Sequence, residues 1–276
     1  MSDLLRDAIS GFLSSNHNRL IIKGRAEQVL PHLPDGCVDL TVTDPAYESL
    51  ERHRATGTTT RLKESKSSSN AWFTTFPNTG YAALFAELHR VHAENTHCYV
   101  FCDSETEHVI LCGYNPYTAL EYRDEYNLPP KGPWKAWPPL TWVKTKAAGY
   151  AGNVEDLQDA DIRSGMGYHW RRSEERILFL ERGRQALINK GWKNVLCGPR
   201  AAKGAFPTQK PASVISKLIR NSSCPGELVL DPMAGSGVVG VVALLTGRRA
   251  ILIDLDITWM TKTLAGALII DAEELL

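Results

Sequence analysis

The hydrophobic positions of this chain fall into short runs that alternate with longer amphipathic stretches. Compact apolar runs predict buried strands at 19–23, 38–43, 97–102, 227–230 and 250–254, and two further runs predict strands at 140–143 and 176–180. Apolar residues at helical spacing predict helices at 26–32, 80–93, 106–112, 208–221, 236–246 and 259–267. Strands that alternate with helices are typical of an α/β fold with a doubly wound, mostly parallel sheet.

Two stretches depart from this alternation. Residues 52–78 are rich in Ser, Thr, Arg and Lys and are predicted to form a mobile loop, whereas residues 114–139 are dense in Pro, Tyr and Trp and predict an ordered insertion. The length of 276 residues fits a single domain, 1–276, that carries both segments.

The composition narrows the class of protein. Apolar residues make up 43% of the chain and charged residues 22%, which is ordinary for a chain with one buried core. No apolar run reaches the ~18–20 residues that span a bilayer, and the N-terminus lacks the pattern of a secretory signal. The six cysteines form no CxxC pair, so we expect reduced thiols, no metal site and a cytosolic protein.

Charge is unevenly distributed, although the formal net charge is zero. Residues 163–210 contain eleven basic and three acidic side chains, and residues 52–70 contain five basic and one acidic. Local basic patches attract phosphate whatever the total charge. Such runs are also common on ordinary solvated surfaces. The charge pattern alone is therefore compatible with nucleic-acid binding and with a solvated surface that binds nothing.

A glycine-rich turn lies between a predicted strand and a predicted helix, at Asp231-Pro-Met-Ala-Gly-Ser-Gly237. Gly235 and Gly237 allow the backbone to bend tightly and approach a ligand, and the following helix offers free amide groups. About twenty residues further on, the next strand ends at Asp254, an acid that can accept hydrogen bonds from the ribose hydroxyls of an adenosine group. No Lys-Ser/Thr follows the glycines, so the turn is not a P-loop.

A second turn, Asp44-Pro45-Ala46-Tyr47, follows the strand at 38–43. Asp44 and Asp231 are therefore both expected at the carboxyl edge of the sheet, where open parallel sheets bind ligands. The Asp44 carboxylate and the Pro45 carbonyl can each accept a hydrogen bond from an exocyclic amino group, which favours a more pyramidal nitrogen and frees its lone pair for attack. Tyr47 offers a flat face on which a base removed from its helix can stack.

The two turns resemble those of the amino-DNA methyltransferases, the DNA methylase N-4/N-6 family. The Asp44 turn precedes the Asp231 turn, as in the permuted beta group of that family, in which the catalytic turn comes before the cofactor turn. The segment 206–211, FPTQKP, is similar to a cofactor-capping segment of that family, and 142–144, 168–172 and 174–180 resemble segments of its phage-type adenine methyltransferases. The resemblance covers roughly residues 20–256. It implies a Rossmann-like, class I S-adenosylmethionine-dependent fold in circularly permuted order, with the two chain ends near each other.

The resemblance also implies roles for individual residues. The catalytic residues would be Asp44, Pro45, Ala46 and Tyr47. Those that bind S-adenosylmethionine would be Phe206, Thr208, Lys210, Asp231, Pro232, Met233, Gly235, Ser236, Gly237 and Asp254. The chain departs from the family pattern at Arg25, Ala46, Phe206 and Val238, where Asp, Pro, His and Thr are usual.

We therefore predict site-specific methyl transfer from S-adenosylmethionine to the N6 amino group of an adenine flipped out of double-stranded DNA. An acid in the first position of the catalytic turn is typical of adenine-directed members of the family. Three alternatives remain open: cytosine-N4 methylation, RNA methylation and a catalytically inactive DNA-binding regulator. A dehydrogenase is disfavoured, because Asp44-Pro45 has no role in hydride transfer. The resemblance further implies a bacterial or phage-encoded cytoplasmic enzyme, acting without a membrane or a metal, that forms a homodimer.

The predicted DNA-contacting surface combines the loop 52–78, the aromatic insertion 114–139 and a short target-recognition segment, 183–205. Its basic residues are Arg52, Arg54, Arg61, Lys63, Arg171, Arg172, Arg184, Lys190, Lys193, Arg200 and Lys203.

Overall fold

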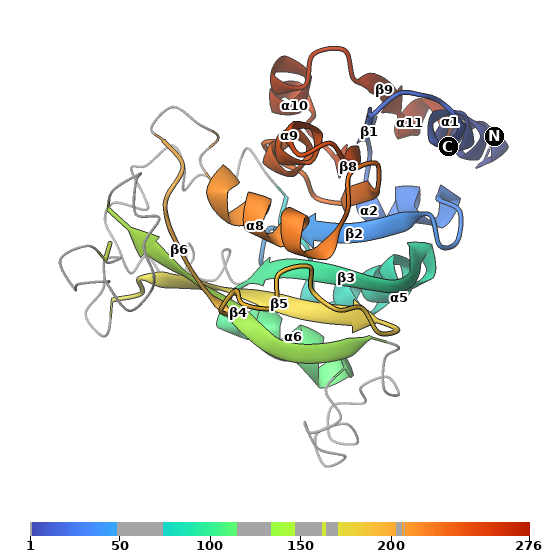
Figure 1. Cartoon of the computed structure of the whole chain (residues 1–276). Helices are drawn as coiled ribbons and strands as arrows, with labels where there is room; N and C mark the ends of the chain where they lie inside the picture. The colour runs from blue at the N-terminus through green and yellow to red at the C-terminus, as the bar shows by residue number, and fades with distance from the viewer. Residues whose placement is uncertain are drawn as a thin grey trace.

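A nine-stranded sheet forms the centre of the described part of the chain. The computed structural model describes residues 2–48, 74–114, 134–146, 162–163, 171–202, 206 and 208–276. Within these residues nine strands lie in the order β6-β4-β5-β3-β2-β7-β8-β1-β9 (Figure 1). They are β1 (Arg19–Lys23), β2 (Val38–Thr43), β3 (His92–Cys102), β4 (Lys135–Thr145), β5 (Glu174–Arg182), β6 (Val195–Pro199), β7 (Leu228–Asp231), β8 (Arg249–Asp254) and β9 (Leu268–Asp271). All neighbouring pairs are parallel except the two made by β5, which confirms the predicted mostly parallel sheet.

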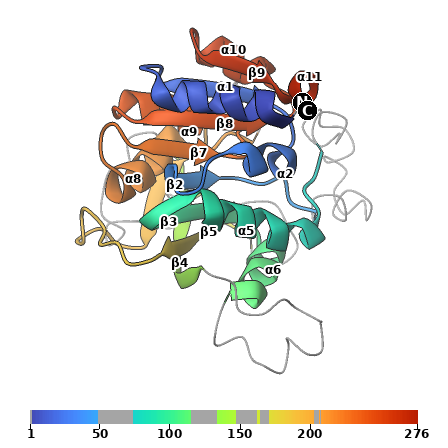
Figure 2. The ribbon, with the colours of Figure 1, turned by 90° about the vertical axis from the view of Figure 1, so that its right-hand side faces the viewer.

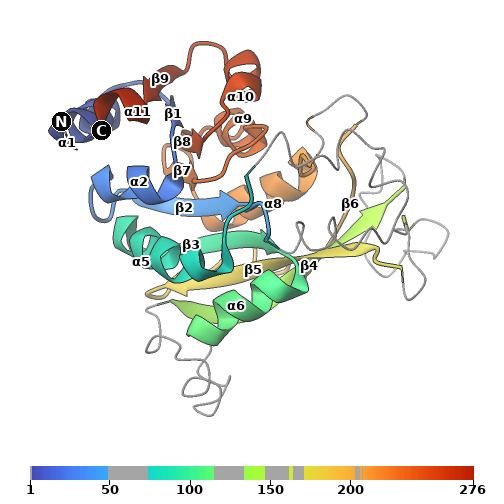
Figure 3. The ribbon, with the colours of Figure 1, turned by 180° about the vertical axis from the view of Figure 1, so that it is seen from behind.

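Helices cover both faces of the sheet, as Figures 1 and 3 show from opposite sides. One face carries α8 (Ala212–Ser222), α9 (Val238–Leu245) and α10 (Thr258–Thr263). The other carries α1 (Ser2–Ser14), α2 (Ala26–Val29), η1 (Leu30–His32), η4 (Asn78–Gly80), α5 (Tyr81–Val91), α6 (Ser104–Tyr114) and α11 (Ala272–Leu275). In β1, Leu20 and Ile22 pack into one core and Ile21 into the other. Alternate residues of a strand thus supply two cores, as a doubly wound sheet requires.

The predicted elements agree closely with the observed ones. The strands at 19–23 and 38–43 match β1 and β2 residue for residue, and the other five predicted strands overlap β3, β4, β5, β7 and β8. The predicted helix 26–32 is matched by α2 followed directly by η1, and the other five predicted helices are present with shifted ends. The largest shifts are at the end of α10, from 267 to 263, and at the start of α8, from 208 to 212. Helix α8 begins at Ala212 because Pro211 caps it in an extended conformation. The thiols of Cys98 and Cys102 are buried, as the apolar run around them predicts.

Four elements were missed. The edge strand β6 is short and contains Gly198 and Pro199, so it lacks the apolar run of a central strand. The edge strand β9, LIID, has an apolar run as long as that of the central strand β7, LVLD, and was overlooked. Helix α11 has only four residues. Helix α1 was overlooked, although the helical spacing of Leu5, Ile9 and Phe12, which are buried, predicts it.

The three irregular segments need new boundaries. Residues 135–139, assigned to the aromatic insertion, belong to β4, whose pairing with β5 shifts register between Trp137 and Leu140. Residues 115–133 of the insertion and 52–73 of the predicted loop lie outside the described residues, whereas Phe76 of that loop is buried. Within 183–205, Val195–Pro199 forms β6 in the sheet.

The two ends of the chain meet in this sheet. The N-terminal strand β1 lies between the C-terminal strands β8 and β9, and the termini are adjacent in Figure 2. This confirms the proximity expected for a permuted order. None of the helices in the described ranges is long and apolar enough to cross a membrane.

Helix α9 packs closely on β8 at Gly240. A Cβ atom added to Gly240 would lie 2.5 Å from Cδ1 of Leu252 and 3.2 Å from Cδ1 of Leu264. Leu252 is fully buried, so it cannot move aside without displacing its neighbours in the core.

We predict that Gly240→Ala lowers the free energy of unfolding by ~1–2 kcal/mol, because overpacking outweighs the better helix propensity of alanine. The matched control is Gly11→Ala in α1, where an added Cβ meets nothing within 4 Å. This control should raise the free energy of unfolding by ~0.5–1 kcal/mol. Urea unfolding followed by circular dichroism measures both, and equal effects of the two substitutions would contradict the close packing.

Candidate active site

The pairing of β2 with β7 brings the two predicted turns together. The strands run parallel, with Leu40 opposite Val229 and Thr41 opposite Leu230. Both segments therefore leave the sheet at the same edge, where Asp44 follows β2 and Asp231 ends β7. This carboxyl edge is where parallel sheets place ligands.

The glycine turn after β7 is tied to the end of β8. Gly235 and Gly237 have φ of 47° and 76°, in the left-handed region that favours glycine. The Gly235 amide donates to Oδ2 of Asp254 at 2.7 Å, and the Ala234 amide donates to the Ile253 carbonyl at 2.9 Å. These bonds hold the Asp254 carboxylate beside the turn, although burial raises the pKa of this carboxyl.

Asp231 is buried beneath the same turn. Its Oδ1 accepts a hydrogen bond from the Met233 amide at 3.2 Å. Burial raises the pKa of Asp231 to about 8, and the nearby carboxylates of Asp254 and Asp44 add to the shift. A cationic group bound nearby would favour the charged form of Asp231.

The turn after β2 is held from two sides. The Tyr47 hydroxyl donates to Oδ1 of Asp44 at 2.7 Å, and the Phe76 amide donates to the Ala46 carbonyl at 2.7 Å. Tyr47 and Phe76 also form an isolated parallel bridge. The end of the predicted loop 52–78 therefore packs directly against the turn that carries Asp44.

Lys210 contacts the Asp44 carboxylate. Its Nζ lies 2.6 Å from Oδ2 of Asp44 and 3.2 Å from Oε2 of Glu175. Burial raises the pKa of Asp44 even though Lys210 opposes this shift. Burial would lower the pKa of Lys210, but the Asp44 and Glu175 carboxylates outweigh it and raise that pKa. Lys210 therefore stays cationic.

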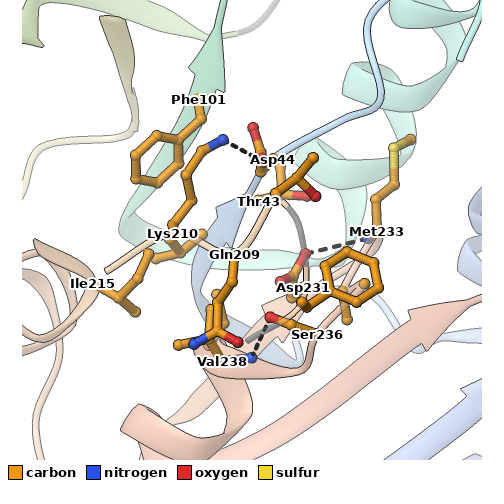
Figure 4. A pocket seen from close by; sticks show the side chains of 16 residues that line it. Thr43, Asp44, Phe101, Gln209, Lys210, Ile215, Asp231, Met233, Ser236 and Val238 are labelled. Atoms are coloured by element: carbon orange, nitrogen blue, oxygen red, sulfur yellow. Dashed lines mark hydrogen bonds and ion pairs between the residues drawn. The ribbon is translucent and has the colours of Figure 1, made fainter. Parts of the chain in front are cut away.

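A cavity of about 480 Å³ joins the two turns. The turn Asp44 to Tyr47 lines one part of it, and Gly235, Asp254 and Lys210 line others. A smaller recess of about 50 Å³ adjoins it, where Thr43, Asp44 and Asp231 lie together (Figure 4). The main cavity has the size of a small-molecule site.

Most residues predicted to bind or act on ligands meet at this cavity. Those lining it are Asp44, Pro45, Ala46, Tyr47, Phe206, Thr208, Lys210, Pro232, Met233, Gly235 and Asp254. Asp231 and Ser236 line the adjoining recess. Gly237 lines neither space and instead forms the N-cap of α9.

The basic residues predicted to contact DNA lie at different places. Arg171 and Arg172 precede β5 and Arg200 follows β6, so these three lie at the carboxyl edge that carries Asp44. Because β5 is antiparallel, Arg184 leaves the sheet at the opposite edge, and so do Lys190 and Lys193 before β6. Arg52, Arg54, Arg61, Lys63 and Lys203 lie outside the described residues.

Sequence reasoning missed several residues at or near the site. Among them, Phe76 lines the cavity, and Glu175 and Lys144 form with Lys210 a chain of ion pairs that ends at Asp44. Arg25, which the sequence marks as a departure from the family pattern, also lines the cavity. Glu175 and Lys144 occur in segments that resemble the family, which was the available signal. Strand periodicity does not reveal that β4 and β5 bring their side chains to the same edge as Asp44.

A protein-family model described as a DNA methylase, N6_N4_Mtase, matches residues 38–263. The match covers most of the chain. The chain therefore belongs to the N6/N4 DNA methylase family, and the resemblance inferred from its two turns is confirmed.

Individual relatives are similar over shorter stretches. The DNA adenine methyltransferase YhdJ of Escherichia coli (strain K12) is 48% identical over 50 residues, which is 18% of this chain and 17% of the relative. The matches to three curated relatives, YhdJ among them, span between 17% and 34% of those relatives' own lengths.

Solved structures share the fold over nearly the whole chain. The M1.HpyAVI–SAM complex is 17% identical with a TM-score of 0.53, covering 88% of this chain and 95% of its own. The cytosine-N4-specific PvuII DNA methyltransferase is 13% identical with a TM-score of 0.58, covering 90% and 86%. These likenesses agree with the predicted class of fold.

Asp231→Asn tests the electrostatics of the glycine turn. Between the ordinary Asp pKa of 3.8 and the folded value of about 8, folded Asp231 keeps a proton that the unfolded chain has lost. The ionisation of Asp231 therefore makes the ligand-free protein less stable as the pH rises through this range. We predict that the melting temperature of Asp231→Asn, relative to wild type, increases from pH 5 to pH 9. A difference that does not change with pH would contradict the raised pKa.

Proposed function

We propose that this chain is an S-adenosylmethionine-dependent DNA methyltransferase that methylates the N6 amino group of adenine. The observation that carries the proposal is the single cavity lined by the Asp44 turn and by Gly235 with Asp254. The Asp44 turn has acceptors for an amino nitrogen, and the glycine turn with Asp254 has groups that can bind an adenosyl cofactor. The name of YhdJ, a DNA adenine methyltransferase, supports adenine as the target.

The residues around the glycine turn fit S-adenosylmethionine. The Asp254 carboxylate accepts two backbone amides, from Gly235 and Asp256, and a carboxylate offers about four acceptor sites. It therefore retains capacity for ribose hydroxyls. Buried Asp231 would gain from a neighbouring cation, and the cofactor carries both an ammonium and a sulfonium. The M1.HpyAVI protein, whose fold is similar, is described as a complex with SAM.

When bound, S-adenosylmethionine supplies an electrophilic methyl group. Asp44 and the Pro45 carbonyl would each accept a hydrogen bond from the target amino group and so turn its lone pair toward that methyl. As the nitrogen–methyl bond forms, the bond from the methyl to sulfur breaks and S-adenosylhomocysteine is the leaving group. The methylated nitrogen would then lose one proton to solvent or to Asp44. Tyr47 supports the base by stacking. A strong general base is unnecessary, so the main contribution of the protein is to hold the reactants in near-attack geometry.

Adenine is favoured because the catalytic turn begins with an acid, Asp44, as in adenine-directed members of the family. Three of the proposed DNA contacts, Arg171, Arg172 and Arg200, lie at the carboxyl edge. The others are Arg52, Arg54, Arg61, Lys63 and Lys203, which lie outside the described residues. Arg184, Lys190 and Lys193 leave the opposite edge of the sheet, and the proposal does not rest on them. The double-stranded DNA partner, the homodimer and the cytoplasmic location stay predictions.

Incubation with methyl-labelled S-adenosylmethionine and, in separate reactions, genomic DNA free of methyladenine or RNA tests this function. We predict N6-methyladenine by nucleoside mass spectrometry. Asp44→Ala should reduce the rate about 100-fold or more, because the target amino group loses its charged acceptor. Asp7→Ala in α1, which removes an exposed acid, is the matched control and should act like wild type.

Each alternative has its own outcome in this assay. Methylcytosine as sole product would contradict adenine, and label transferred to RNA but not to duplex DNA would contradict the substrate. Full activity in Asp44→Ala would contradict the mechanism.

A further inference from the structure

The side chain of Lys210 is aimed at the catalytic turn. Lys210 lies in the segment that lines the cavity with Phe206 and Thr208, just before α8. Figure 4 shows its side chain passing Phe101 to reach Asp44, and its ammonium lies 5.3 Å from the centre of the Phe101 ring. Only 11% of the side chain is exposed. A long, buried cation of this kind needs nearby negative partners.

Those partners form a chain of alternating charges. Lys144 Nζ lies 2.9 Å from Oε1 of Glu175, and Oε2 of Glu175 lies 3.2 Å from Lys210. Lys210 then contacts Asp44 at 2.6 Å. The four groups come from β4, β5, the segment before α8 and the turn after β2. Two cations and two anions balance, so each desolvated charge has a partner of opposite sign.

Both oxygens of Asp44 are thereby fixed. Tyr47 donates to Oδ1 at 2.7 Å, and Lys210 holds Oδ2 at 2.6 Å. Because a carboxylate has about four acceptor sites, these two partners leave room for a target amino group. Rotation of the Asp44 carboxylate would break both contacts.

We propose that Lys210 is a positioning residue for Asp44, and that Glu175 and Lys144 hold Lys210 in place for this role. The inference rests on the proposed function, since it assigns Asp44 to the target amino group. It differs from the role that the sequence resemblance assigns to Lys210, which is contact with the cofactor.

The sign of the electrostatic effect can be worked out for each partner. The titratable groups that face Asp44 are Tyr47 in its own turn, Lys210 before α8, Glu175 on β5, Asp231 on β7 and Tyr81 on α5. Lys210 opposes the upward shift that burial causes in the pKa of Asp44, whereas Glu175 adds to it. Removal of the Lys210 charge should therefore raise this pKa, and removal of the Glu175 charge should lower it.

Two variants and one control test the role of Lys210. Lys210→Met and Glu175→Gln remove one charge each, and Lys217→Met removes an exposed lysine of α8. For each, steady-state kinetics on DNA give kcat and KM across pH, and calorimetry gives the Kd for S-adenosylmethionine. We predict that Lys210→Met lowers kcat about 10- to 100-fold, because a misplaced acceptor spoils near-attack geometry. The Kd should change less than twofold.

The pH profiles separate positioning from a merely structural role. The acidic limb of kcat/KM should move to higher pH in Lys210→Met and to lower pH in Glu175→Gln, while Lys217→Met keeps the wild-type limb. A Kd raised tenfold in Lys210→Met, with kcat and the acidic limb unchanged, would make Lys210 a cofactor ligand and overturn the inference. Wild-type kinetics in Lys210→Met would overturn it as well. Either result leaves the proposed function intact, because that function is tested separately by the methylated product of wild type and by the activity of Asp44→Ala.

Discussion

The parallel pairing of β2 with β7 is the constraint on which the site depends. These strands are far apart in the sequence, yet Leu40 lies opposite Val229 in the centre of the sheet, and both are fully buried. Their turns must therefore emerge side by side. A shift of one residue in this register would move Leu40 and Val42 out of the core that they share with α8, so side-chain packing secures the distance between the turns. The hydrophobic core thus sets the positions of the polar groups.

Three acids are concentrated at the carboxyl edge of the sheet. Asp44, Asp231 and Asp254 all have pKa values raised by burial. Of the three, Asp44 has a cation, Lys210, in direct contact. Buried acids destabilise a folded protein unless a cation or hydrogen bonds offset the loss of water. In the proposed function, a cationic cofactor provides that compensation for Asp231, which links binding to the stability of the turn.

Much of this arrangement could be predicted from the sequence because local patterns determine it. The apolar runs of β1 and β2 and the acid-plus-glycine turn at 231–237 each occupy a few consecutive residues. Pairs that form across the sheet were not predictable in this way. No local pattern places Glu175 of β5 next to Lys210, since the two are joined only by the folded topology. The edge strand β6 was missed for a related reason, because a short strand with Pro199 gains its structure from β4.

In the proposed function, the two turns hold a methyl donor and a target amino group at the same time. A crystal structure with a non-reactive analogue of S-adenosylmethionine and duplex DNA bearing the methylation site tests it most directly. We expect the analogue to lie against Gly235 and Asp254, and an extrahelical adenine to donate hydrogen bonds from its N6 amino group to Asp44 and to the Pro45 carbonyl. An analogue bound elsewhere, or a target base held away from Asp44, would contradict it.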